Sequence, residues 1–136
     1  MTTLLEELTW RGFVNQTTFS NLEDVNNSRT FYWGVDPSAD SMHIGNLAPA
    51  MMIRHFMDHG HKAILLIGGA TGMIGDPDGK KQERDLLTKD QISKNIAGIV
   101  AQYHEIFQGH DSEVVNNYDW FKDFNYLDFL REVGKH

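Results

Sequence analysis

Residues 62–67 read KAILLI and run without a break into the glycine-rich stretch GGATGMIGDPDGKK at residues 68–81. A short apolar run without alternation is typical of a strand in a parallel sheet that is covered on both faces. Glycines directly after such a strand let the backbone turn sharply and approach a ligand or a second loop closely. This stretch therefore predicts a buried parallel strand that leads into a ligand-binding loop.

The sequence before this strand shows a strand pattern and then a helix pattern. The run Arg29–Val35 is aromatic and β-branched, which predicts a strand. From about Leu47 to His59 apolar residues recur with helical periodicity, and Gly60 ends the predicted helix. Pro49 fits this helix only in its first turn, because proline has no N–H to donate inside a helix.

The sequence after the glycine-rich loop continues the alternation. A capping box of Thr88 and Gln91 opens a helix that lasts until Gly109, and a strand at about 113–116 and a helix at about 126–133 follow. Strands that alternate with helices predict an α/β fold with a doubly wound, Rossmann-like parallel sheet and right-handed crossovers. Three strands are few for such a sheet, so we expect residues 1–136 to form an incomplete domain.

The first 28 residues are expected to form a leading helical segment of this domain. Thr3 and Glu6 make a capping box, and leucines on one face continue the helix until Gly12. Residues 13–28 are rich in Asn and Thr, which predicts a loop with a short helical turn.

Composition excludes several classes of protein. A formal charge of −7 argues against a chain that mainly neutralises nucleic-acid phosphates, and the absence of cysteine excludes disulfides and thiolate metal sites. Glu6 and Glu7 stand where a signal peptide carries basic residues, and no stretch reaches membrane-spanning length. We therefore expect a cytoplasmic protein without membrane contact.

The loop YWGVDPSADSMHIGN at residues 32–46 follows the first predicted strand. Ligands of doubly wound sheets bind at the carboxyl ends of the strands, where loops lead into helix amino termini. Gly34 and Gly45 allow close backbone approach, and His43 and Asn46 flank the helix start, which together predict a phosphate-binding edge. An ordinary polar strand-to-helix turn is about equally compatible with these residues.

The second loop is neither a Walker sequence nor a clean GxGxxG turn. Its glycines are expected to let two loops pack near a substrate. Lys80 and Arg84 could offer mobile cations to a polyphosphate, although a solvated loop surface is the commoner reason for such residues. Asp76 alone could equally cap a turn before Pro77.

Four segments occur in a characteristic order: YWGVDPSADSMHIGNL, then GHKAILLIGGATGMIGDPDGK with ER just after it, then NNYDWF, then FLREVGKH. In order and spacing they resemble bacterial tyrosyl-tRNA synthetases, from about Phe31 to the last residue. HIGN is similar to the HIGH motif of class I synthetases, with Asn in the final position.

The resemblance implies a tyrosine-tRNA ligase. In this family the tyrosine carboxylate attacks the α-phosphate of ATP and expels pyrophosphate, and the tyrosyl group then passes to tRNA(Tyr). ATP with Mg²⁺ would be a substrate, without a tightly bound cofactor; the complete enzyme would be a homodimer that contacts tRNA mainly through segments absent here. We expect residues 1–136 alone to be inactive. The alternative is a non-catalytic half-synthetase that binds a nucleotide or an amino acid.

The resemblance also assigns roles to individual residues. Tyr32 corresponds to a residue that meets the substrate phenol, Asp76 to the partner of the α-ammonium, and Asn117 to a neighbour of the tyrosine site. Without the resemblance, Tyr32 would be interpreted as a core aromatic and Asn117 as a turn residue. The residues implied at ATP and the leaving pyrophosphate are Gly34, Asp36, Ser38, His43, Gly45, Asn46, Lys80 and Arg84.

Two residues depart from the family pattern near the ribose. Trp33 stands where the family often has a small residue, so its indole points elsewhere or the pocket has another shape. Pro49 stands where some relatives place a polar residue.

Three histidines, His55, His59 and His61, raise the question of a metal site. His55 and His59 lie one helical turn apart, but no HExxH carboxylate and no cysteine accompany them. We therefore expect a solvated helix end and no metal site.

Overall fold

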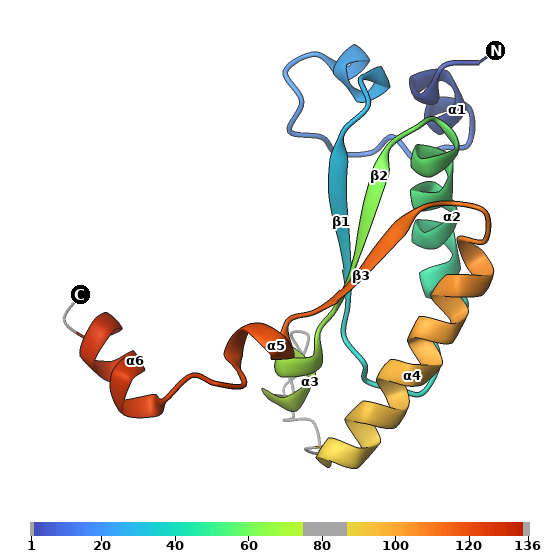
Figure 1. Ribbon diagram of the computed structural model, residues 1–136. Helices are drawn as coiled ribbons and strands as arrows, with labels where there is room; N and C mark the ends of the chain where they lie inside the picture. Colours follow the sequence, from blue (N-terminus) through green and yellow to red (C-terminus); the bar gives the residue numbers. More distant parts are fainter. Residues whose placement is uncertain (1, 75–86, 135–136) are drawn as a thin grey trace.

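A computed structural model describes residues 2–74 and 87–134. Its centre is a parallel sheet in the order β1-β2-β3, formed by β1 (Thr30–Val35), β2 (Lys62–Ile67) and β3 (Ser112–Asn116) (Figure 1). The register places Trp33 beside Leu65 and Leu65 beside Val114. The α/β class and the parallel, Rossmann-like sheet are thereby confirmed.

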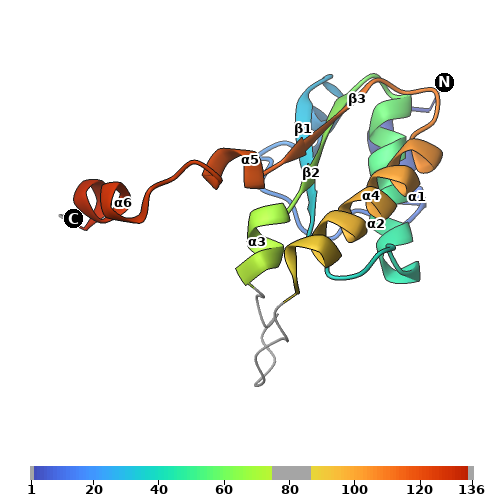
Figure 2. The ribbon, with the colours of Figure 1, turned by 60° about the horizontal axis from the view of Figure 1, so that its bottom comes forward.

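One face of the sheet, here called the covered face, packs against α2 (Ile44–Asp58) and α4 (Lys89–Ile106). Both helices lie on the same side of the sheet in Figures 1 and 2, because each crossover leads to the next strand in the same direction. The buried residues of this layer come from α2, β2 and α4, and from the residue directly after α4: Ala50, Ile53, Met57, Ala63, Leu65, Ile67, Ile99, Tyr103 and Phe107. Each large side chain among them contributes about 1.5–3 kcal/mol by leaving water.

The opposite face, here called the open face, is exposed to different degrees along the strands. Tyr32 is 71% exposed, whereas Ile64 and Leu66 are half-buried. The expectation that β2 is covered on both faces is therefore wrong for the described residues. Its apolar residues do occupy both faces, but α2 and α4 pack on only one of them, and Ile64 and Leu66 on the other face are half-buried.

Short helices follow the second and third strands: α3 (Gly69–Ile74) comes after β2, and α5 (Tyr118–Phe121) and α6 (Tyr126–Val133) come after β3. α6 extends away from the sheet in both views (Figures 1 and 2). Its apolar side chains are exposed.

The leading segment forms a second, smaller core. α1 (Leu4–Trp10) and the 3₁₀ helix η1 (Leu22–Asn26) bury Leu4, Leu8 and Val25 together. The predicted capping box is present, since the Thr3 N–H donates to Glu6 Oε2 over 2.8 Å and the Glu6 N–H donates to Thr3 Oγ1 over 3.2 Å. The predicted opening helix and the helical turn before β1 are thus confirmed.

The predicted ends of three helices coincide with glycines in the left-handed region. Gly12, Gly60 and Gly109 have φ values of 74°, 84° and 88°, which a side chain would strain. The start of α2 differs from the prediction: the helix begins at Ile44, so Pro49 lies in the second turn and not in the first. Among residues 2–74 and 87–134, no helix combines the length and the apolar character needed to cross a membrane.

Candidate functional site

An open cavity of about 540 Å³ lies where β1 and β2 end. The β1–α2 loop forms one wall, and Gly68 and Thr71 at the start of α3 form another. Six of the predicted site residues line it: Gly34, Asp36, Ser38, His43, Asn46 and Asn117. The carboxyl edge of a parallel sheet is the place where α/β proteins bind ligands.

His43 is the N-cap of α2. Its Nδ1 accepts a hydrogen bond from the Gly45 N–H over 3.0 Å, while Asn46 Oδ1 accepts one from the His43 N–H over 3.1 Å. This reciprocal pair is a capping box built from His and Asn, and it explains why α2 begins before Leu47. Because Nδ1 acts as an acceptor, the proton of the neutral imidazole is on Nε2, which can donate to a ligand.

Gly45 leaves room for the His43 ring in its observed position. A Cβ at Gly45 would stand 2.8 Å from His43 Cε1, closer than side-chain carbons come in real structures. The ring therefore lies against the bare backbone of the helix start. The positive end of a 15-residue helix at this position favours an anion. Gly45 is not among the residues that line the cavity, so its contact with adenine stays a prediction.

A polar network joins the ends of the three strands at the floor of the cavity. Thr71 Oγ1 donates to Asp36 Oδ1 over 2.6 Å, and Asn117 Nδ2 donates to Thr71 Oγ1 over 3.4 Å. Asn117 Oδ1 accepts from the Ala70 N–H over 2.7 Å, and Asn117 is buried. Buried polar groups that are satisfied in this way hold their neighbours in one arrangement.

Thr71 was missed by the sequence reasoning. The only indication of Thr71 in the sequence was its position among the glycines that follow β2. Those glycines allow the packing that was predicted for them, because a Cβ at Gly68 would overlap the Asp36 carboxylate and one at Gly69 would overlap the Asn116 amide. The network therefore depends on small residues at the start of α3.

The remaining predicted residues are distributed differently. Tyr32 lies on the open face and does not line the cavity, although it shares that face with Gly34 two residues later. Asp76, Lys80 and Arg84 lie outside the described residues.

Trp33 borders the cavity but directs its ring to the covered face. Its ring centroid lies 5.6 Å from that of Tyr103 and 6.3 Å from that of Phe107. Burial raises the pKa of Tyr103, whose hydroxyl has no hydrogen-bond partner among the described residues. Trp33 therefore closes the core behind the cavity.

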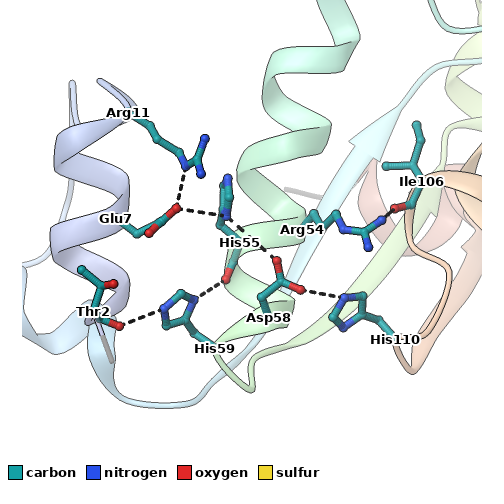
Figure 3. A network of polar contacts seen from close by, with 9 residues as sticks. All are labelled: Thr2, Glu7, Arg11, Arg54, His55, Asp58, His59, Ile106 and His110. Carbon is teal, nitrogen blue, oxygen red and sulfur yellow. Dashed lines mark hydrogen bonds and ion pairs between the residues drawn. The ribbon is translucent and has the colours of Figure 1, made fainter.

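The other histidines of α2 lie at its far end and join three elements (Figure 3). His110 Nε2 is 2.9 Å from Asp58 Oδ1, and His55 Nδ1 lies 3.9 Å from Glu7 Oε1 and 4.0 Å from Asp58 Oδ2. A hydrogen bond from Arg11 is the main cause of a lowered pKa at Glu7. Within the described ranges, no group of three or more His, Asp or Glu residues is arranged to hold a metal ion. The network connects α1 and the segment before β3 to α2.

These features define a Rossmann-like α/β protein with a candidate anion-binding site at the carboxyl edge of its sheet. The family model described as tRNA synthetases class I (W and Y) matches residues 24–136, and the chain belongs to this family. The predicted resemblance to class I synthetases is confirmed.

Similar proteins agree with this assignment. The chain is 50% identical over 138 residues to a tyrosine-tRNA ligase of Rhodopirellula baltica; the match covers 97% of the chain and 32% of that relative, so the chain spans about a third of the relative's length. A C-terminally truncated mitochondrial tyrosyl-tRNA synthetase of Coccidioides posadasii has a TM-score of 0.74 at 27% identity over 99% of this chain and 40% of its own. The corresponding Aspergillus nidulans structure, at 24% identity and a TM-score of 0.72, covers 100% of this chain and 43% of its own and supports the fold alone.

Proposed function

We propose that residues 1–136 are the amino-terminal part of the catalytic domain of a tyrosine-tRNA ligase, with residues 1–28 as its leading segment. The complete enzyme would convert tyrosine and ATP into tyrosyl-adenylate and pyrophosphate, and then transfer the tyrosyl group to tRNA(Tyr). The observation that carries this proposal is the His43-capped helix start beside an open cavity of about 540 Å³, in a chain of the class I synthetase family.

The proposed chemistry needs positioning and charge stabilisation but no protein nucleophile. An oxygen of the tyrosine carboxylate bonds to the α-phosphorus, and the bond from that phosphorus to the bridging oxygen breaks with its electron pair leaving on pyrophosphate. His43 Nε2–H and Ser38 would donate to the phosphates as negative charge develops there, and the positive end of α2 would stabilise that charge. Lys80 and Arg84 are proposed to add positive charge, and Mg²⁺ would arrive with ATP and keep mainly phosphate and water ligands.

The ribose and adenine would lie along the β1–α2 loop. Gly34, Asp36 and Gly45 expose backbone to the nucleotide; the Asn46 side-chain oxygen accepts from the His43 N–H, and its amide nitrogen has no hydrogen-bond partner among the described residues. This division of the Asn46 amide leaves a donor for the ribose.

Tyrosine would enter from the open face of the sheet. The hydroxyl of Tyr32 is proposed to meet the substrate phenol, and Asp76 is proposed to pair with the α-ammonium. Asn117 would act indirectly, because its hydrogen bonds hold Thr71 and Ala70 in position. A cytoplasmic homodimer whose tRNA contacts lie mainly in other segments completes the proposal.

Pyrophosphate exchange into ATP tests the function. A full-length synthetase with residues 1–136 at its start should incorporate labelled pyrophosphate into ATP only when tyrosine is present. Exchange driven by tryptophan, or by no amino acid, would contradict the tyrosine assignment. Residues 1–136 alone should show no exchange; tyrosine-dependent exchange by this piece would instead show that the catalytic set is complete within it.

A further inference from the structure

The β1–α2 loop, which carries Asp36, Ser38 and His43, is held from outside the cavity by one face of α4. Three α4 residues face it: Asn95, Gly98 and Gln102. Their spacing of three and then four residues places them on successive turns of the same helix face. The apolar positions of α4 that pack on the sheet, such as Ile99 and Tyr103, lie beside this row.

Asn95 holds the beginning of the loop. Its Nδ2 donates a hydrogen bond of 2.9 Å to the Pro37 carbonyl. Asn95 is only 8% exposed and Pro37 is fully buried, so water cannot readily replace a lost partner. Leaving such a buried group unsatisfied is more costly than losing an exposed hydrogen bond.

Gln102 holds the end of the loop. Its Oε1 accepts a hydrogen bond of 2.7 Å from the Met42 N–H, in a partly buried position directly before His43. Asn95 therefore acts as a donor and Gln102 as an acceptor. Both assignments are fixed by their partners, since a backbone carbonyl can only accept and a backbone N–H can only donate.

Gly98 lets the middle of the loop touch the helix. A Cβ at this position would overlap the Asp40 carbonyl oxygen. Glycine in a helix interior is unfavourable by about 1 kcal/mol relative to alanine, and here it permits a backbone contact that no other residue allows. The loop is thus fixed at its beginning, middle and end.

We propose that Asn95, Gly98 and Gln102 are positioning residues of the ATP site, which act through the β1–α2 loop without touching the nucleotide. The inference rests on the proposed function, because it assigns that loop to ATP. A shift of the loop by a fraction of an ångström would move Ser38 and His43 relative to the phosphates, and reaction rates are sensitive to such shifts. On the opposite side of the cavity, Asn117 bonds to Ala70 and Thr71, and Thr71 in turn donates to Asp36 of the same loop, so the α4 residues hold the loop from the other side.

The opposite hydrogen-bonding roles of the two amides give a matched test. In the full-length synthetase, Asn95→Asp exchanges a donor for an acceptor that faces a carbonyl, whereas Gln102→Glu keeps the acceptor that the Met42 N–H needs. We expect Asn95→Asp to lower kcat/KM for ATP in pyrophosphate exchange by about tenfold or more, and Gln102→Glu to stay within about threefold of the wild type. Gln102→Met, which has a similar shape but no acceptor oxygen, should lose about tenfold.

The substitutions should lower kcat/KM for ATP without lowering the affinity for tyrosine. Tyrosine binding measured without ATP should stay within about twofold in all three variants, since each hydrogen bond involved lies on the nucleotide side. Equal losses in Asn95→Asp and Gln102→Glu, no loss in either, or a parallel loss of tyrosine affinity would overturn the inference. If Asn95→Asp does not fold, the comparison of Gln102→Glu with Gln102→Met tests the inference by itself. Absence of tyrosine-dependent exchange in the wild type would instead refute the proposed function.

Discussion

Leu65 and Leu66 are adjacent in β2, yet they meet different surroundings. Leu65 points to the covered face, where it is 0% exposed between α2 and α4, whereas Leu66 points to the open face, is half-buried and borders the cavity. The same alternation separates Trp33, which packs on rings of α4 and the residue after it, from Tyr32, which is exposed. One face of the sheet therefore provides stability, and the other is left available for a ligand.

The largest expected effect is a difference between two alanine substitutions. Leu65→Ala should lower the free energy of unfolding by about 3 kcal/mol, because it removes buried surface and leaves a cavity in the core. Leu66→Ala should lower it by about 1 kcal/mol, since its side chain is partly solvated in the folded state. Urea unfolding of both variants measures the difference. Equal losses would show that the two faces are equally packed.

The second expected effect concerns function on the open face. Tyr32→Phe removes only the exposed hydroxyl, so we expect tyrosine affinity to fall by about tenfold while the free energy of unfolding stays unchanged. Equilibrium dialysis with labelled tyrosine on the full-length synthetase measures the first, and urea unfolding the second. Unchanged affinity would remove Tyr32 from the proposed tyrosine pocket.

A smaller effect should appear as a pH dependence at the edge of the covered face. Burial is the main cause of a lowered pKa at His61, although a backbone hydrogen bond with Val25 acts in the opposite direction. Below about pH 6.5, His61 binds a proton in the unfolded chain, whereas its lower pKa keeps it neutral in the folded chain. Stability should therefore fall as the pH decreases from about 6.5 toward the lower folded pKa.

The slope of that decrease is at most about 1.4 kcal/mol per pH unit for one proton. His61→Gln should reduce it, because the amide does not titrate. Unfolding free energies of both proteins between pH 5 and pH 8 provide the measurement. Identical slopes would mean that His61 does not contribute.

The smallest effect is expected from an ion pair on the open face. Lys62 Nζ lies 3.7 Å from Glu113 Oε2, and the two side chains are 51% and 56% exposed. A double-mutant cycle with Lys62→Gln and Glu113→Gln should give a coupling energy below about 0.5 kcal/mol, further reduced by salt. A coupling energy above about 1 kcal/mol would show that solvent screens these two charges less than their exposed fractions indicate.

Most of the framework could be predicted because it depends on local patterns. β2 has the predicted bounds Lys62–Ile67, and the capping boxes at Thr3 and Thr88 start α1 and α4. The glycines that end helices were predictable because only their backbone fits the left-handed region. His43 and Asn46 were predicted to flank the start of α2, but periodicity placed that start at about Leu47 and not at Ile44, since a capping box of His and Asn departs from the usual Ser or Thr with Glu or Gln.

The parts that were missed depend on contacts between distant segments. Thr71, Asn95 and Gln102 meet Asp36 or loop backbone more than thirty residues away. No spacing in the sequence indicates such partners, because side-chain bonds to a loop backbone leave no periodic pattern. The partial cover of β2 was missed for a related reason: an apolar side chain does not reveal which element packs against it.

The central claim is that ATP and tyrosine meet between the β1–α2 loop and the open face of the sheet. Hydrogen–deuterium exchange of the full-length synthetase, with and without a non-hydrolysable tyrosyl-adenylate analogue, tests it directly. We predict slower exchange in peptides that cover residues 32–46 and 68–74, and no change in residues 4–26. Protection of residues 4–26, or none in residues 32–46, would contradict the account.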